Sequence, residues 1–476
     1  MKRFQSSDSS LPAGHPLARR SFLKGVAATG ALALGGGLLS ACGGTASPGE
    51  SGTSADNAGA GTTAAASGGA TSAAAGGSGS GGNKTLTLML ASWVDQGFIT
   101  DVMMGSAAKS IGAELKLVTV DDGTYPAQAA AAQKAGQAPD LIFWTAQGAT
   151  ALLASGVKLA DLDSYVATED KAAFYSADYD ANTIDGKIKG LGFRCNCRGI
   201  VYRGDYAKSA GLTVPDSWTF DEFGKFATAL NVDNHIGFGF EAKTGDGRSS
   251  SNFLPLIWST GSPFVTGGDG AWKPGFTKDQ MTQVMQFYYD AVHTWKSTPS
   301  DAGTWGYENT DGNFAKGLLA SYSAGPFVYP NSKNYPETLQ NLAVGPLPHI
   351  SKPTTFWEEH TLFIHGDSAN QDLAWKFIEA MRGEETQNLI ATRTGDAQLA
   401  VRKAANEAIT DPFVQGFAGL LDNAVVPEPV PIAPLMNNAV LPAIQSVSLK
   451  DTAPADAAAA LIAAMEKELE TINAQK

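Results

Sequence analysis

Cysteine is scarce in this chain of 476 residues, and its scarcity excludes two kinds of small structure. Only Cys42, Cys195 and Cys197 occur, which is too few for a disulfide framework or a thiolate metal cage. On one strand, Cys195 and Cys197 would share a face about 6.5–7 Å apart, too far for an unstrained bridge. We expect two reduced, buried thiols; a strained bridge is the alternative.

Basic side chains are few as well. The chain has 34 Lys and Arg against 47 Asp and Glu, a formal net charge of −13. This balance argues against wholesale nucleic-acid binding, which needs basic patches. Of the six histidines, only His360 and His365 lie close together in sequence. With Glu358 and Glu359 they could hold a cation, but one short segment rarely supplies a full site, so we expect neither a metal nor a cofactor.

Common catalytic motifs are also missing. The sequence contains no Gly-x-Ser-x-Gly, no His-Glu-x-x-His and no Gly-x-x-x-x-Gly-Lys-Ser/Thr, the motifs of nucleophile elbows, zinc proteases and phosphate-binding loops. Glu358 and Glu359 are adjacent, which suits opposite strand faces better than acid-base partners. We therefore expect no catalytic residue, although an exported glycan hydrolase remains an alternative.

The first 41 residues have the pattern of an export signal. Arg19-Arg20-Ser21-Phe22-Leu23-Lys24 is a twin-arginine pattern, and the apolar run 25–39 that follows is too short and glycine-rich for a membrane span. Leu39-Ser40-Ala41-Cys42 then resembles the bacterial lipobox, in which the cysteine becomes the lipidated first residue. The sequence predicts a lipoprotein held at the outer face of the cell membrane through acylated (for example palmitoylated) Cys42.

The segment 42–84 is of low complexity. Between positions 43 and 82, all residues except Pro48, Glu50, Asp56 and Asn57 are Gly, Ala, Ser or Thr. Such a composition cannot bury a core, so we expect a disordered tether.

From Thr85 onward, strand-like and helix-like segments alternate. Strands are predicted over 85–90, 115–120 and 140–144, and helices around 97–112, 127–135, 281–295 and 373–381. Strands separated by helices indicate an α/β fold with a parallel sheet. In such sheets ligands bind beyond the carboxyl ends of strands, and Trp93 and Trp144 fall at two of these ends.

Several segments, taken in order, resemble the extracellular solute-binding proteins of ABC importers, in the group of the maltose-binding protein. They are Gly136–Trp144, Asp185–Phe193, Gly199–Arg203 with Ala210-Gly211-Leu212 and Trp218–Phe223, Phe314–Gly317 with Ser323–Phe327, and Val344–Pro348 with Ala374–Phe377. The chain departs from the family at Gly192, where Pro is usual, and at Arg203, where Asn is usual. A third departure is Phe356–His360, where the family often has Gly-Gly.

The resemblance implies a two-lobe periplasmic-binding-protein fold with discontinuous lobes. Lobe 1 would comprise residues 85–195 and 324–383, and lobe 2 residues 196–323 and 384–476. The chain would cross between lobes near 194–197, return near 323–325 and cross again near 383–384.

The resemblance also indicates where a ligand would bind. Trp144, Gln147 and Phe327 match ligand-binding positions of the family. A sugar offers apolar ring faces and many hydroxyls, so its site needs aromatic platforms with donors and acceptors around them. By their context, the further candidates are Trp93, Asp95, Tyr125, Arg194, Asn196, Trp258, Ser323, Trp357 and Glu358.

The resemblance implies a monomer that captures a small polar ligand, expected to be a sugar or oligosaccharide, and delivers it to the transmembrane subunits of an ABC importer by hinged closure. Binding of a polyol, a glycerol phosphate or a metal ion, and a sensory role outside transport, are alternatives.

Overall fold

The computed structural model describes residues 84–474, apart from positions 233, 269, 394 and 396. The predicted signal segment 1–41, the lipidation site Cys42 and the linker up to residue 83 lie outside the described residues.

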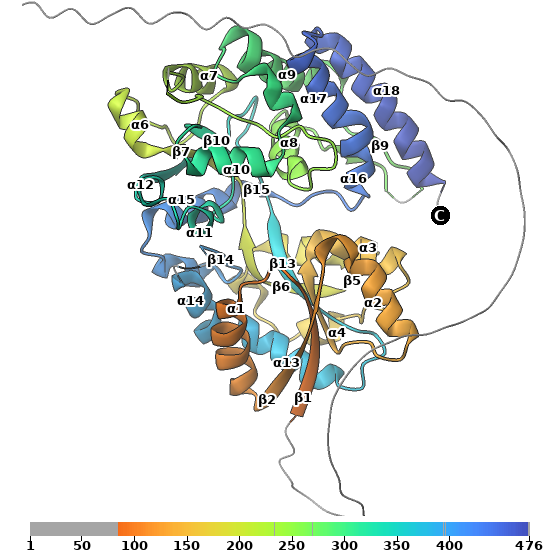
Figure 1. Ribbon diagram of the computed structural model, residues 1–476. Helices are drawn as coiled ribbons and strands as arrows, with labels where there is room; N and C mark the ends of the chain where they lie inside the picture. The colour runs from red at the N-terminus through yellow and green to blue at the C-terminus, as the bar shows by residue number, and fades with distance from the viewer. Residues whose placement is uncertain (1–83, 233, 269, 394, 396, 475–476) are drawn as a thin grey trace, which may run out of the picture. The chain divides into compact units, whose positions relative to one another are not determined.

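A six-stranded sheet forms the first part of the fold (Figure 1). In pairing order its strands are β14 (Leu399–Ala400), β6 (Gly190–Asn196), β13 (Glu358–Ile364), β3 (Leu141–Thr145), β1 (Lys84–Ala91) and β2 (Ala113–Val120). Strand β1 is parallel to β2 and β3, as predicted. The sheet as a whole is mixed, because β13 is antiparallel to both β3 and β6.

Both faces of this sheet are buried. Leu86, Leu88 and Leu90 of β1 pack into one core with helix α13 (Gln371–Arg382), and Met89 packs into another with helix α2 (Tyr125–Lys134). A strand buried on both faces needs an almost continuous apolar run. This is why Leu86–Ala91 was readable as a strand from sequence.

A three-stranded antiparallel sheet forms the centre of the second part. Strand β7 (Gly199–Arg203) lies between β10 (Ser321–Ala324) and β11 (Leu342–Gly345). A large helical core, which includes Ile200 of β7, lies to one side of it; in this core α9 (Lys278–Tyr289), α17 (Leu441–Leu449) and α18 (Pro454–Asn473) pack against one another (Figure 1). The apolar stripe predicted over 281–295 is buried in this core, as expected.

The other elements are short. The helices are α1 (Gln96–Phe98), continued by wider turns over Ile99–Ala108, α3 (Ala149–Ala154), α4 (Asp163–Val166), α5 (Ser176–Ala181), α6 (Gly204–Ser209), α7 (Phe220–Ala229), α8 (Ser249–Trp258), α10 (Tyr307–Ala315), α11 (Val328–Asn331), α12 (Pro336–Leu339), α14 (Glu384–Thr392), α15 (Pro412–Leu420) and α16 (Ile432–Leu435). The remaining strands pair in twos: β4 (Thr183–Ile184) with β5 (Lys187–Ile188), β8 (Val265–Thr266) with β9 (Lys273–Pro274), and β12 (Thr355–Phe356) with β15 (Ala424–Val425).

Strand pairing differs from the predicted lobe boundaries at two segments. Strand β11, expected in lobe 1, pairs with β7 of the three-stranded sheet, and β14, expected in lobe 2, pairs with β6 of the six-stranded sheet. The chain was expected to cross back between the lobes at 323–325. This segment overlaps β10, which belongs to the three-stranded sheet. Short pairings between distant segments leave little local signal in a sequence.

The two body cysteines are free and buried. Cys195 Sγ lies 3.5 Å from the Ala400 carbonyl and Cys197 Sγ 3.4 Å from that of Phe417. Burial raises the pKa of the Cys197 thiol to about 12. The expectation of two reduced thiols agrees with this arrangement.

A buried ionic cluster explains why Gly192 replaces the usual proline. The Gly192 amide donates to Asp178 over 2.8 Å, a bond that proline cannot make. A Cβ atom there would lie 2.7 Å from Glu359 Oε2 and 2.9 Å from Asp178 Oδ1. Arg382 pairs with Asp178 over 2.6 Å and also donates to the Gly192 carbonyl. Only glycine leaves room for both acids here.

Candidate functional site

Three strands end side by side at one edge of the six-stranded sheet, and an aromatic or acidic residue follows each. Trp93 comes after β1, Asp122 after β2 and Trp144 at the end of β3. Both indoles donate to the same atom: Trp93 Nε1 lies 3.1 Å and Trp144 Nε1 2.7 Å from Asp122 Oδ1. One carboxylate oxygen thus fixes two indole rings. Trp93 remains 43% exposed.

Tyr125 supports Trp144 from behind. The two rings stack with centroids 4.9 Å apart and planes at 6°. The Tyr125 hydroxyl donates to the carbonyls of Met89 and Phe143, and burial raises its pKa well above the usual value. Tyr125 was predicted to contact ligand, but its side chain is buried and its hydroxyl is used inside the core. The structure gives it a supporting role.

The first residues of β13 reach the same edge of the sheet. Because strand side chains alternate, Glu358 and His360 share one face and Glu359 lies on the other. Glu359 accepts hydrogen bonds from Trp357 Nε1 and Thr361 and lies in the buried cluster with Asp178. His360 stacks obliquely on Trp93, with ring centroids 4.8 Å apart. Its Nδ1 accepts a 2.6 Å hydrogen bond from Arg194 Nε.

Arg194 lies in a second layer behind this edge. It is 4% exposed, and its guanidinium lies 4.1 Å from the centroid of the Phe98 ring. Arg194 was predicted to contact the ligand directly. The structure instead gives it an indirect role, because it orients His360. Burial and the positive charges of Arg194 and Arg198 lower the pKa of His360 well below its usual value.

Asn196 and Glu358 both bind Arg198, which the prediction did not include among the site residues. Arg198 Nη1 donates to Asn196 Oδ1 over 2.6 Å, Nε donates to Ser251 over 2.9 Å, and Nη2 pairs with Glu358. The guanidinium also lies 5.3 Å from the centroid of the Phe327 ring. Asn196 is buried, whereas the Glu358 side chain is 24% exposed.

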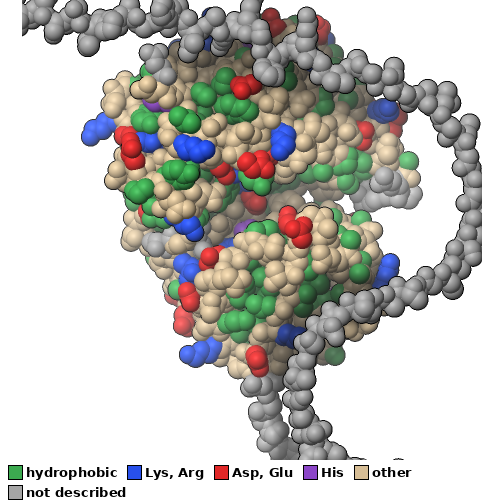
Figure 2. Space-filling model, in the orientation of Figure 1, with side chains coloured by type: hydrophobic (Ala, Val, Ile, Leu, Met, Phe, Trp, Pro, Cys, Tyr) green, Lys and Arg blue, Asp and Glu red, His purple; other side chains and the backbone are tan. Residues whose placement is uncertain are grey.

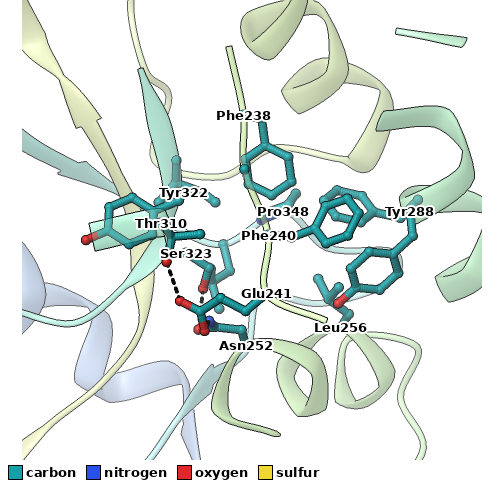
Figure 3. A pocket seen from close by; sticks show the side chains of 14 residues that line it. Phe238, Phe240, Glu241, Asn252, Leu256, Tyr288, Thr310, Tyr322, Ser323 and Pro348 are labelled. Carbon is teal, nitrogen blue, oxygen red and sulfur yellow. Dashed lines mark hydrogen bonds between the residues drawn. The ribbon is translucent and has the colours of Figure 1, made fainter. Parts of the chain in front are cut away.

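Ser323 belongs to a polar network with Asn252 and Glu241. Its hydroxyl donates to Asn252 Oδ1 over 2.9 Å, and Asn252 Nδ2 donates to Glu241 over 2.9 Å (Figure 3). Glu241 also accepts from Arg248 and Thr310. Burial raises the pKa of Glu241, and the charge of Arg248 offsets part of that rise. Arg248 lies 5.1 Å from the Phe327 ring centroid.

The network lines a cavity of about 20 Å³ whose opposite wall is made by Phe238, Phe240 and Tyr288 (Figure 3). This is room for about one water molecule. Ligand pockets are typically larger than about 300 Å³, so the cavity is a packing feature. Figure 2 shows a hollow in the described surface, with acidic side chains along its sides.

Two predicted tryptophans lie in cores. Trp258 is 3% exposed, donates to Glu428 over 3.3 Å and stacks on Phe356. Trp357 is fully buried and donates to Glu359 over 2.9 Å. With their rings enclosed and their N–H groups satisfied, neither can serve as a ligand platform in this conformation, and the prediction is corrected for both. Burial is the common state of tryptophan.

Asp95 and Gln147 lie beside the aromatic edge and serve local structure. Asp95 caps α1 by accepting from the Phe98 amide over 2.8 Å, and it faces Arg393 at 3.5 Å. Gln147 Nε2 donates to the Trp357 carbonyl over 3.3 Å. Both side chains are partly or fully accessible, so their predicted ligand contacts stay predictions.

Neither Asp122 nor His360 was among the predicted ligand-binding residues. The rule that selected Trp93 and Trp144 also selects Asp122, because Asp122 follows the carboxyl end of the second strand. His360 gave no such signal, because its strand enters the sheet from more than 200 residues farther along the chain.

Over the described ranges, no group of three or more His, Cys, Asp or Glu residues is arranged to hold a metal ion. His365 Nε2 instead lies 2.8 Å from Gln133 Oε1. Of the helices in the described part of the chain, none has both the length and the apolar character of a membrane span.

Comparison with known proteins gives one family. Residues 106–415 match the family model described as bacterial extracellular solute-binding protein. A mannitol-binding protein of Pseudomonas aeruginosa is 24% identical over 226 residues, which make up 46% of this chain and 51% of that protein. The chain thus matches about half the length of this relative.

Solved structures share the fold. The cyclic alpha-maltosyl-1,6-maltose binding protein of Arthrobacter globiformis has a TM-score of 0.70 at 18% identity, with 82% of this chain and 100% of that chain covered. An ABC transporter solute binding protein of Agrobacterium vitis with bound D-mannitol has a TM-score of 0.61 at 20% identity, covering 82% and 99%. One of Thermotoga lettingae, bound with alpha-D-tagatose, has a TM-score of 0.66 at 20% identity, covering 82% and 100%. The predicted two-lobe α/β fold is confirmed.

Proposed function

Since the chain belongs to the family of bacterial extracellular solute-binding proteins, we propose that it captures a small neutral sugar or sugar alcohol for an ABC importer. The observation that carries the proposal is the pair of indoles fixed by Asp122 Oδ1 at the carboxyl edge of β1 and β3. An aromatic face packs on the C–H face of a sugar, and fixed rings lose little conformational entropy on binding.

Charge favours a neutral ligand over a glycerol phosphate. Binding an anion calls for several convergent cations. Arg198 is already paired with Glu358, and Arg393 faces Asp95 and Asp101. A phosphate would have to compete with these carboxylates. The relatives named above that bind mannitol and tagatose support the same ligand class.

We further propose that the two sheets belong to two lobes that close on the ligand. The crossing segment after β6 and the segment before β13 are joined, because the Arg198 amide donates to Thr355 Oγ1 over 2.8 Å. A hinge built from such tied segments can bend while each sheet stays rigid. Ligand favours the closed form only through its greater affinity for it, and the importer would recognise that form.

Export and anchoring complete the proposal. Cys42 would carry the lipid, residues 1–41 would be removed, and the protein would act as a monomer without catalytic activity of its own. Mass spectrometry of the membrane-derived protein tests the anchor: a mature chain beginning at acylated Cys42 is expected, and an unmodified Cys42 would contradict it.

A thermal-shift screen tests the ligand class. The panel would hold D-mannitol, D-tagatose, maltose, glycerol 3-phosphate and amino acids. At a thousandfold excess over Kd, the true ligand should stabilise the fold by about 4 kcal/mol. Small-angle scattering with the best ligand then tests closure, since a radius of gyration unchanged at saturation would overturn the hinge. Stabilisation by amino acids alone would overturn the sugar proposal.

A further inference from the structure

His360 is a buried histidine beside the aromatic edge of the six-stranded sheet. It is 8% exposed, contacts the rings of both Trp93 and Phe143, and pairs in the sheet with Thr145 on one side and Arg194 on the other. Its neighbour Trp93 is half-exposed at the edge of the sheet, so the imidazole lies directly beside the proposed sugar platform.

The tautomer of His360 follows from its partner. A guanidinium has only donors, so Nδ1 must be the acceptor of the 2.6 Å bond from Arg194 Nε. The ring proton is therefore on Nε2. Burial and the charges of Arg194 and Arg198 keep the pKa low, so the ring is neutral at ordinary pH.

The Nε2–H group is a donor without a partner. Within the described ranges no acceptor bonds to it, and it is not sealed from solvent. An unsatisfied donor at a mostly buried position costs free energy unless something accepts from it. A ligand hydroxyl packed against Trp93 would supply that acceptor.

We propose that His360 Nε2–H donates a hydrogen bond to a hydroxyl of the bound sugar or sugar alcohol, and that Arg194 fixes the tautomer that makes this possible. The inference rests on the function proposed above and adds a specificity residue to it. A ligand that lacks this hydroxyl leaves the donor unpaired and is discriminated against.

Two variants distinguish the role of His360 Nδ1 from that of Nε2. His360→Asn keeps an oxygen near the position of Nδ1 for Arg194 and removes the Nε2 donor. His360→Gln keeps a donor near Nε2 and loses the Nδ1 acceptor. With the full chain and the best sugar of the panel above, His360→Asn should weaken Kd about tenfold, the value of one hydrogen bond. His360→Gln should retain more of the affinity. Each deoxy derivative of that sugar lacks one hydroxyl. Wild type and His360→Asn should bind one of these derivatives equally, because it lacks the hydroxyl that accepts from His360.

A measurement on the unchanged protein guards against misfolding of the variants. With ¹⁵N-labelled histidine, the His360 Nε2–H signal should shift on titration with that sugar. If His360→Asn binds every derivative as tightly as wild type, or if the signal does not move at saturation, the inference fails while sugar binding stands. If no sugar or sugar alcohol in the panel stabilises the wild type, both proposals fail.

Discussion

Trp144 is held from two directions: its ring lies on Tyr125 at 4.9 Å, and its indole N–H points to Asp122. The ring is thus fixed in position and in rotation. A platform that is ordered before the ligand arrives loses less entropy when the ligand binds. This pre-organisation makes Asp122 a positioning residue of the proposed site.

Asp122→Ala should therefore weaken sugar binding while leaving the fold intact. Both indoles lose their shared acceptor, and we expect an affinity loss of about 1–2 kcal/mol, or roughly tenfold. Asp122 is exposed, so the melting temperature of the free protein should change little. Isothermal titration calorimetry measures the loss. Asp122→Asn keeps an acceptor oxygen and serves as the matched control; equal affinity in wild type and Asp122→Ala would show that Asp122 has no positioning role.

The sequence predicted local structure better than it predicted partnerships. The strands ending near Leu90, Val120 and Trp144 were confirmed, because each carries either an apolar run or an alternation of apolar and polar residues that is typical of a strand. The insertion of β13 between β3 and β6 was not foreseen, because nothing local in Glu358–Ile364 specifies a partner more than 150 residues away.

The candidate site shows the same limit. Alternation predicted that Glu358 and Glu359 face opposite ways, and this agrees with the structure. Which of the two faces the core depends on Asp178, Asn182 and Arg382, which other segments bring into place. Trp357 was expected at the surface of the site. This prediction failed for the same reason, because the burial of Trp357 depends on Tyr175, which comes from a distant loop.

Glu359 should make the stability of the fold depend on pH. Burial and the nearby charge of Asp178 raise its pKa well above the usual value. A group with a raised folded pKa stabilises the fold below its unfolded pKa, about 4.3, and this stabilisation is lost as pH rises through the folded pKa.

Relative to Glu359→Gln, wild type should therefore lose stability from about pH 5 upward, by at most about 1.4 kcal/mol per pH unit. Urea unfolding between pH 5 and 8 measures the difference. Exposed Glu466→Gln is the control and should follow wild type. Parallel pH curves for wild type and Glu359→Gln would contradict the prediction.

Arg382 should contribute far more to stability than a surface cation. It is 2% exposed and pairs with Asp178 at 2.6 Å and with Glu169 at 2.7 Å. Arg382→Met leaves the buried Asp178 carboxylate without its cationic partner, which costs about 3–5 kcal/mol. Lys158→Met breaks only the exposed pair with Asp367, worth about 0–1 kcal/mol. Chemical denaturation of both variants tests the contrast, and comparable losses would refute it.

The thiols offer a test that joins the body of the protein to its proposed anchor. Cys195 and Cys197 are buried, and burial raises the pKa of both thiols, that of Cys197 to about 12. Since the thiolate is the reactive species, the native protein should react with a disulfide reagent far more slowly than the protein unfolded in guanidinium. Two equivalents of thiol are expected after unfolding if the Cys42 sulfur carries the lipid in the membrane-derived protein. A Cys42→Ala form made without lipid is the control and should also give two. Three equivalents from the membrane-derived protein would show that the Cys42 sulfur carries no lipid, and fast reaction of the native Cys42→Ala protein would show that the body thiols are accessible.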